Sequence, residues 1–242
     1  MESVITSDPR HARLREHLCF VFENEDAFAN AADDFLAAGR ALGEQTLKIA
    51  RASIADLYAD EADPAAQIDA YRRAVDRALN DGFSGLRVAA DVTELVRDPE
   101  KRDVFVRYEH LIDRAMLDMP FSALCAYNRS ILDSTVDEVV CMHPDSNTQG
   151  CGFAFSATRA GCALTGEVDI FNVDQFALAL SRLPASARRQ IDATDLEFID
   201  HRGMLALDAT GERVELRTCL STAKGLAEIL HLAFVDVTLV GR

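Results

Sequence analysis

The chain has 242 residues, of which 49% are hydrophobic, so it can form one large domain or two modest ones. Its formal net charge of −15 argues against binding to a phosphate backbone, which requires a basic surface. No apolar run reaches the roughly 18 residues that span a membrane, and the first residues lack the apolar stretch of a signal peptide. We therefore expect a cytoplasmic protein that binds neither nucleic acid nor membranes.

The first 143 residues alternate between apolar runs and helical patterns. The apolar runs predict strands at 17–24, 45–50, 85–91 and 121–128. The helical patterns predict helices at about 25–43, 62–82, 97–118 and 134–142. Strands that are apolar on both faces and alternate with helices are typical of a mostly parallel sheet covered by helices.

The segment 143–152, "HPDSNTQGCG", is polar and rich in turn-forming residues, which indicates an interdomain linker. The α/β pattern restarts after it. Further strands are expected near 153–158, 162–165, 190–194 and 213–217, and a strand ends with Phe198-Ile199. Helices are expected at about 173–183, from about residue 203, and at about 222–231.

Two motifs in this second half resemble the STAS domain, the fold of anti-sigma-factor antagonists. "LTGEVDIFN" (Leu164–Asn172) is similar to the Leu-x-Gly-Glu-Leu-Asp turn of that family, and "LEFIDHRGMLAL" (Leu196–Leu207) to its Phe-Ile-Asp-Ser-Ser-Gly-Leu motif. The resemblance implies a smaller STAS α/β domain over 153–242.

The first half resembles the MEDS domain, a sensory module related to RecA-like ATPases. The similar pieces include "HLCFVFENEDAF", "DPAAQIDAYRRAVDRALNDGFSGLRVAAD" and "YEHLIDRAMLDMPFSALCAYNR", and they span about 15–143. This resemblance implies a RecA-like, mostly parallel sheet with helices on both faces. The segment between Ala50 and Asp63 is shorter than in that family, as is the STAS segment from Gly203 to Val214, so the switch helix of the latter is expected to be a stub.

The sequence argues against an ATPase. A P-loop requires G-x-x-x-x-G-K-[ST], but "ENEDAFANAADD" follows the first strand and offers carboxylates in place of Gly and Lys. Asp91 lies where a Walker-B acid would be, and we interpret it as a helix cap. No G-x-S-x-G elbow is present, so we expect a non-enzyme.

The carboxyl ends of parallel strands are the usual place for a ligand. We expect a small organic ligand there, or at the start of the first strand, where MEDS relatives also tend to have a histidine. The candidate ligand-binding residues are His17, Phe22, Glu23, Asp91 and Tyr127. The alternative is that His17 is a strand-end histidine that bonds to a backbone carbonyl.

We predict no metal site and no cofactor. None of the six histidines forms a pair at metal-binding spacing. The six cysteines lack any C-x-x-C, and we expect buried free thiols. The helix containing "YEHLIDR" is expected to bury Tyr108 and Ile112 and to expose Glu109 and Asp113 to solvent.

The STAS resemblance places Asp200, His201, Arg202 and Gly203 at the switch that binds a partner. In STAS antagonists a serine begins the switch helix, and its phosphorylation breaks the complex through added negative charge. His201 takes that position here and has no hydroxyl. We therefore predict a partner-binding surface that a Ser/Thr kinase does not phosphorylate.

Three functions remain as hypotheses. The first is a non-enzymatic signalling regulator in which a sensor of a small molecule or a partner is coupled to a STAS domain that binds an anti-sigma factor or a similar Ser/Thr-kinase-like protein. The second is a residual nucleotide-binding or small-molecule enzyme in the RecA-like half. The third is an oligomerising scaffold, and a homodimer is compatible with each of them.

Overall fold

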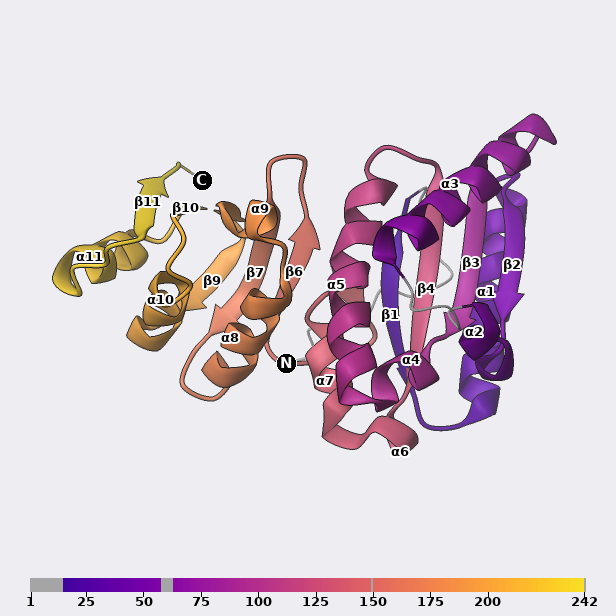
Figure 1. Ribbon diagram of the computed structural model, residues 1–242, viewed down its shortest axis with the longest axis horizontal. Helices are drawn as coiled ribbons and strands as arrows, with labels where there is room; N and C mark the ends of the chain where they lie inside the picture. Colours follow the sequence, from indigo (N-terminus) through magenta and orange to yellow (C-terminus); the bar gives the residue numbers. More distant parts are fainter. Residues whose placement is uncertain (1–14, 58–62, 149, 242) are drawn as a thin grey trace. The chain divides into compact units, whose positions relative to one another are not determined.

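The computed structural model describes residues 15–57, 63–148 and 150–241 and divides into two compact units, each with its own sheet (Figure 1). The first unit extends to Val139 and also includes the segment from His143. The second unit comprises Val140–Met142 and the chain from Gly150 onward. Both are α/β, which confirms the predicted fold class. Among the described residues, no helix is both long enough and apolar enough to cross a membrane.

The first unit is built on a parallel five-stranded sheet in the order β2-β3-β4-β1-β5. Its strands are β1 (His17–Phe22), β2 (Gln45–Ile49), β3 (Leu86–Asp91), β4 (Phe121–Asn128) and the short β5 (Asp145–Ser146). Every side chain of β3 and β4 is buried, as expected for central strands covered on both faces.

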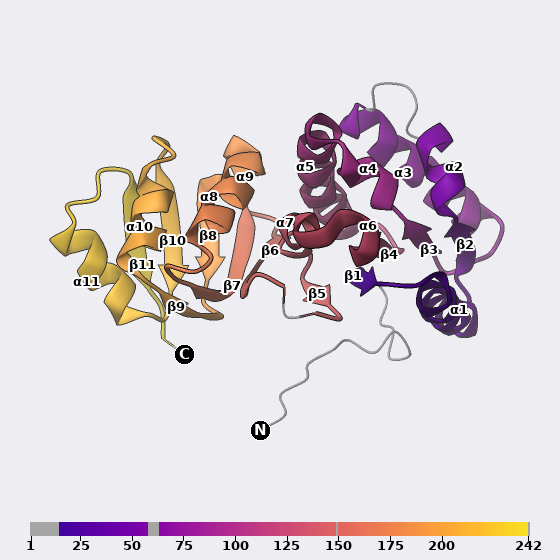
Figure 2. The same ribbon diagram turned by 90° about the horizontal axis from the view of Figure 1, so that it is seen from below.

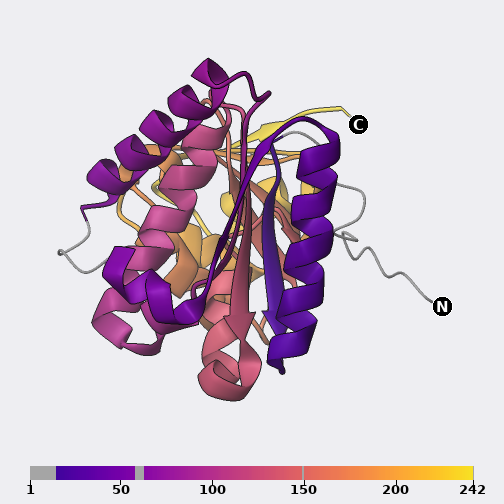
Figure 3. The same cartoon turned by 90° about the vertical axis from the view of Figure 1, so that its right-hand side faces the viewer.

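Helices cover the two faces of this sheet. Figure 3 shows α1 (Glu25–Ala41) on one side, and α3 (Pro64–Asn80) and α5 (Pro99–Met116) on the other. Alternate strand residues face α1 and form an apolar core with Phe28 and Phe35. Shorter elements complete the unit: α2 (Arg51–Leu57), α4 (Thr93–Arg97), α6 (Arg129–Leu132), the 3₁₀ turn η2 (Asp133–Val136) and α7 (Asp137–Val140).

The long helices begin at side-chain caps. Asn24 accepts a hydrogen bond from the backbone N–H of Ala27, and Asp63 accepts one from that of Ala65. Asp98 accepts from the backbone N–H groups of Glu100 and Lys101 at the start of α5. Each cap acts only on the next two or three residues. The start of each long helix is therefore encoded locally in the sequence.

Three local features differ from the prediction. In place of the single helix expected at about 134–142, the turn η2 leads into the short helix α7, which ends at Val140, and Asp133, with a positive φ of 51°, ends α6 before them. The short segment after Ala50 forms α2, whereas residues 58–62 lie outside the described part of the chain. The segment expected as a linker contributes β5 to the sheet, where it pairs with β1.

The second unit contains a mixed sheet in the order β11-β10-β8-β7-β6, with β9 also paired to β7. Its strands are β6 (Phe153–Ala157), β7 (Cys162–Val168), β8 (Gln190–Ala193), β9 (Leu196–Ile199), β10 (Val214–Thr218) and β11 (Val235–Leu239). β6 is antiparallel to β7, and the other pairs are parallel. Strand β11 was not predicted.

The helices of this unit are α8 (Val173–Arg182), α9 (Ala185–Arg188), α10 (His201–Asp208) and α11 (Ser221–Ile229). Helices α8 and α10 lie side by side (Figures 1 and 2). Helix α10 begins at His201, two residues earlier than predicted, because Asp200 caps it by accepting from the backbone N–H groups of Arg202 and Gly203. It ends after eight residues, so the helix is short.

Candidate functional site

A cluster of buried polar side chains lies between the sheet of the first unit and α5. His17 of β1 pairs in register with Ala123 of β4, so alternate residues of the two strands point to the same face. That face carries His17 from β1 and Cys125 and Tyr127 from β4, all of them buried. The register of β1 with β4 therefore places these three polar side chains on one buried face of the sheet.

Glu109 of α5 is at the centre of this cluster. Its Oε2 lies 3.0 Å from Nε2 of His17, and its Oε1 accepts a hydrogen bond of 2.9 Å from the Tyr127 hydroxyl. The Sγ of Cys125 lies 3.8 Å from the same Oε2. The Glu109 side chain is completely shielded from solvent.

The prediction that Glu109 and Asp113 face solvent was therefore wrong. Both residues are buried, and Asp113 Oδ1 lies 3.4 Å from Nδ1 of His17. The physical reason is that α5 packs against α3 and α4 as well as facing the sheet, so most of its circumference is covered. A two-sided amphipathic interpretation fails for a helix in that position.

His143 completes the cluster from the segment that follows α7. Its Nδ1 lies 3.0 Å from the carbonyl oxygen of Val139, which fixes the ring and makes Nδ1 the donor. Its Nε2 lies 3.6 Å from Oε2 of Glu109 and, among the described residues, has no hydrogen-bond partner. The ring centroids of His143 and His17 are 4.4 Å apart.

Burial and neighbouring charges give the two histidines of the cluster different protonation states. Burial alone would lower the pKa of His17, but hydrogen bonds to Asp113, Cys125 and Glu109 raise it well above its usual value. Burial and the charge of His17 lower the pKa of His143 to about 4. At neutral pH, His17 is therefore protonated and His143 is neutral.

The carboxyl group of Glu109 and the thiol of Cys125 also differ in protonation state. Burial tends to raise the pKa of Glu109, but His143, His17 and the Tyr127 hydroxyl lower it overall, so the carboxylate is ionised. Burial and the charge of Glu109 raise the pKa of the Cys125 thiol to about 11. Cys125 is thus a thiol at neutral pH and a poor nucleophile.

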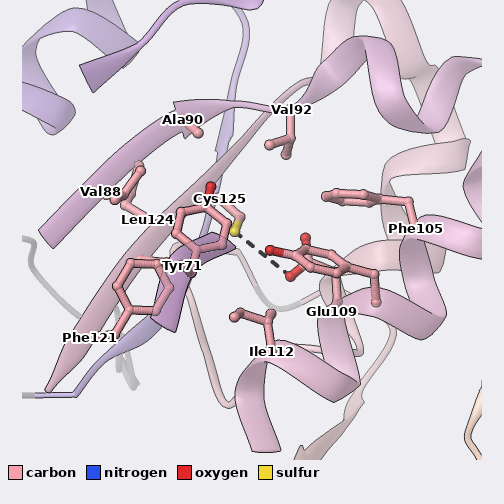
Figure 4. A pocket seen from close by; sticks show the side chains of 12 residues that line it. Tyr71, Val88, Ala90, Val92, Phe105, Glu109, Ile112, Phe121, Leu124 and Cys125 are labelled. Carbon is pink, nitrogen blue, oxygen red and sulfur yellow. Dashed lines mark hydrogen bonds between the residues drawn. The ribbon is translucent and has the colours of Figure 1, made fainter. Parts of the chain in front are cut away.

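A cavity of about 20 Å³ adjoins the cluster (Figure 4). Its lining is mostly apolar, and in Figure 4 Glu109 points from α5 toward Cys125, with the rings of Tyr71 and Phe121 nearby. A cavity of this size has room for about one water molecule. It does not accommodate a small organic ligand in this conformation.

The structure separates the predicted ligand-binding residues. His17 and Tyr127 converge on Glu109. His17 is buried, and its ring nitrogens lie beside the carboxylates of Glu109 and Asp113 rather than a backbone carbonyl. Phe22 packs into the core on the opposite face, and Glu23 is exposed. Asp91 accepts from the N–H and hydroxyl of Thr93 at the start of α4, in the manner of a cap.

Sequence reasoning missed Glu109, Cys125 and His143. These residues come from a helix, a strand and a presumed linker, and no local spacing relates them to each other or to His17. The available signal was alternation in β4, which puts Cys125 and Tyr127 on one face. That signal required knowing which helix covers the face.

In the second unit, the switch-equivalent residues gather at the start of α10. His201 and Arg202 are exposed, Asp200 caps the helix, and Gly203 is buried against Ile199 and Val168. The backbone N–H of Asp200 donates to the carbonyl of Val168, so the loop after β7 adjoins this helix end. That loop carries Phe171, which is 93% exposed.

The comparisons with known proteins bear on the first unit. A search of curated proteins finds no match to this chain. One family profile matches, and it is described as "MEDS: MEthanogen/methylotroph, DcmR Sensory domain". Four of the clustered side chains, those of Glu109, Cys125, Tyr127 and His143, fall within the matched region, and His17 lies outside it. The chain thus contains, at residues 53–144, a region similar to the MEDS sensory domain.

Proposed function

We propose that this protein is a non-enzymatic signalling regulator, in which the first unit senses a signal and the second binds a partner protein. The observation that carries this proposal is the match of residues 53–144 to a sensory-domain family, in the region that supplies most of the buried polar cluster. Ionised and neutral groups buried together outside a catalytic motif suit a detector whose state responds to what binds there.

Two features support a role without catalysis. The sequence lacks the P-loop that a RecA-like nucleotide hydrolase uses, and acidic residues follow β1 in its place. In addition, the Cys125 thiol is buried and its pKa is raised to about 11, which disfavours covalent catalysis by this residue.

For the second unit, we propose that the partner is an anti-sigma factor or a similar Ser/Thr-kinase-like protein, as the STAS resemblance implies. The proposed binding surface, called the α10 surface below, consists of Phe171, His201, Arg202 and Leu205. All four are exposed, and large exposed apolar side chains beside charged ones are typical of protein-binding surfaces. Through such a partner, the protein would regulate transcription.

The test is incubation of the full chain with a candidate anti-sigma kinase and ATP, with complex formation and phosphate incorporation measured together. We expect a complex and no phosphate within 196–207. Phe171→Ala should weaken the complex about tenfold or more, because exposed aromatic anchors dominate interface energies.

Phe234→Ala is the matched control. Phe234 is 42% exposed, precedes β11 and donates its backbone N–H to Asp208, at the end of α10 away from His201. The control should bind as the unmodified chain does. Phosphate within 196–207, or equal weakening by both variants, would contradict the proposed binding surface.

A further inference from the structure

Four side chains with metal-binding atoms converge in the interior of the first unit. They are Nε2 of His17, a carboxylate oxygen of Glu109, Sγ of Cys125 and Nε2 of His143, and all lie within 4.8 Å of one another. We propose that these four residues bind one divalent transition-metal ion, with Zn²⁺ as the ion that this donor set fits best.

The distances between the donor atoms fit a tetrahedral ion. In tetrahedral zinc sites with nitrogen, oxygen and sulfur donors, bond lengths near 2.0–2.3 Å place the donors roughly 3.3–3.6 Å apart. Here Glu109 Oε2 lies 3.0 Å from His17 Nε2 and 3.6 Å from His143 Nε2. Cys125 Sγ lies 3.7 Å from His17 Nε2 and 3.8 Å from Glu109 Oε2. These four distances are within a few tenths of an ångström of the tetrahedral values, and the remaining two, from His143 Nε2 to His17 Nε2 and to Cys125 Sγ, are at most 4.8 Å.

The surroundings of His143 favour a cation in the cluster. Because Nδ1 donates to the Val139 carbonyl, Nε2 of the neutral ring carries a lone pair. Nε2 lies 3.6 Å from Oε2 of the Glu109 carboxylate, and both atoms are acceptors. An acceptor buried without a donor costs free energy, and a metal ion bound by both atoms removes that cost.

Residues that neighbour the four proposed ligands orient them, as neighbours of metal ligands usually do. A histidine ligand commonly donates its second ring N–H to a carboxylate or a backbone carbonyl. His143 donates to the Val139 carbonyl in this way, and Asp113 Oδ1 lies 3.4 Å from Nδ1 of His17. The Tyr127 hydroxyl donates to the second oxygen of Glu109 and fixes the carboxylate. These three contacts orient three of the four ligands before any ion is bound.

The donor set also indicates which ion binds. One thiolate and two imidazoles favour Zn²⁺ or a neighbouring transition metal over Mg²⁺ and Ca²⁺, which prefer oxygen. Four protein ligands leave no open position for substrate, which is typical of a non-catalytic zinc site. Binding would release two protons, one from the Cys125 thiol and one from the protonated His17 ring. One divalent ion would thus replace two protons, and the net buried charge would be unchanged.

The site is a property of the first unit and does not depend on the regulatory role proposed above. The test is production of the full chain with Zn²⁺ in the medium, followed by measurement of bound metal per chain. We expect one equivalent. Replacement by Co²⁺ should give the absorption of tetrahedral Co²⁺ together with a thiolate-to-cobalt charge-transfer band.

Two variants remove one ligand each. His143→Asn can keep the hydrogen bond to Val139 while losing the Nε2 ligand, and Cys125→Ser should abolish the charge-transfer band. Each should lower zinc affinity by more than about 100-fold, since loss of a supporting residue alone costs about 10–100-fold. The matched controls are His231→Asn, at an exposed position whose φ of 52° suits Asn, and Cys219→Ser, and both should bind one equivalent.

Far-ultraviolet circular dichroism shows whether each variant folds, and the measurement on the unmodified chain decides the proposal if a variant does not. Less than about a tenth of an equivalent of metal in that chain, with no Co²⁺ spectrum after refolding in the presence of Co²⁺, overturns the site. Equal metal content in the unmodified chain and a folded His143→Asn also overturns it.

Discussion

Nε2 of His143 lies 3.6 Å from Oε2 of Glu109, in the interior between β4 and α5. With Nδ1 bound to Val139, Nε2 of the neutral ring carries a lone pair beside a carboxylate. Protonation of Nε2 would remove this conflict, but burial and the nearby charge of His17 oppose it. The relationship makes His143 sensitive both to pH and to any cation that enters the cluster.

The first prediction concerns the pH dependence of stability without metal. The pKa of His143 is about 4 in the folded chain, against 6.5 for an unperturbed histidine. Between these values the unfolded chain binds more protons, so acidification through this window lowers the free energy of unfolding, by at most about 1.4 kcal/mol per pH unit from this group. Above about pH 6.5 the group contributes no slope.

His143→Asn removes this contribution. Urea unfolding from pH 4 to 8, with chelator present, should show a flatter slope for the variant than for the unmodified chain. His17, Glu109 and Asp113 also face His143, and they remain in both proteins, so the difference isolates His143. Parallel pH profiles would contradict the assignment.

The second prediction concerns a buried ion pair. Arg87 and Glu44 form a salt bridge whose side chains are both inaccessible to solvent, and the guanidinium carbon of Arg87 lies 4.4 Å from the ring centroid of Phe35. Glu44→Gln leaves a buried cation without its main counter-charge, and should lower the free energy of unfolding by about 3 kcal/mol or more.

The exposed pair of Arg213 and Asp236 is the control for this change. Its side chains are 83% and 56% exposed, so water screens the attraction. Asp236→Asn should change stability by less than about 1 kcal/mol in the same urea experiment. Similar losses for the two variants would mean that burial does not set the strength of the pair.

The third prediction compares two helical glycines. A Cβ on Gly203 of α10 would lie 2.7 Å from Cγ1 of Ile199 and 2.8 Å from Cγ1 of Val168, whereas one on Gly225 of α11 would meet nothing within 4 Å. Gly203→Ala should destabilise the protein by about 1–3 kcal/mol through overpacking. Gly225→Ala should stabilise it by about 0.5–1 kcal/mol through helix propensity.

Thermal unfolding of both variants measures this difference. Because both glycines are in helices, the propensity gain is similar and the contrast reports the close packing of α10 on β7 and β9. A Gly203→Ala protein as stable as Gly225→Ala would show that α10 can move away from the sheet at little cost.

The fourth prediction tests the proposed loss of the phosphorylation switch. His201→Ser restores a hydroxyl at the first residue of α10, where the helix dipole favours a phosphate. Incubated with an anti-sigma kinase that binds the chain, this variant should incorporate phosphate, and His201→Ala should not. Phosphate incorporated into the alanine variant would place the acceptor elsewhere in the chain.

Local patterns in the sequence predicted most of the elements. Apolar runs located β1 to β4, and the helical spacing of apolar residues located the long helices, because both patterns act within a few residues. The same reasoning failed at Asp133, whose positive φ ends α6. It also failed for β11, a mostly exposed edge strand whose only strand partner is β10.

The polar cluster depended on the tertiary structure. His17, Glu109, Cys125 and His143 are far apart along the chain, and the register of β1 with β4 and the packing of α5 bring them together. The spacing of the histidines along the sequence could reveal only metal-binding motifs whose residues are close together in the chain. By itself, the sequence determined an α/β chain with its helices and strands in order. Which side chains meet in the interior was decided by strand order and helix packing, since long-range contacts follow from the way whole elements assemble.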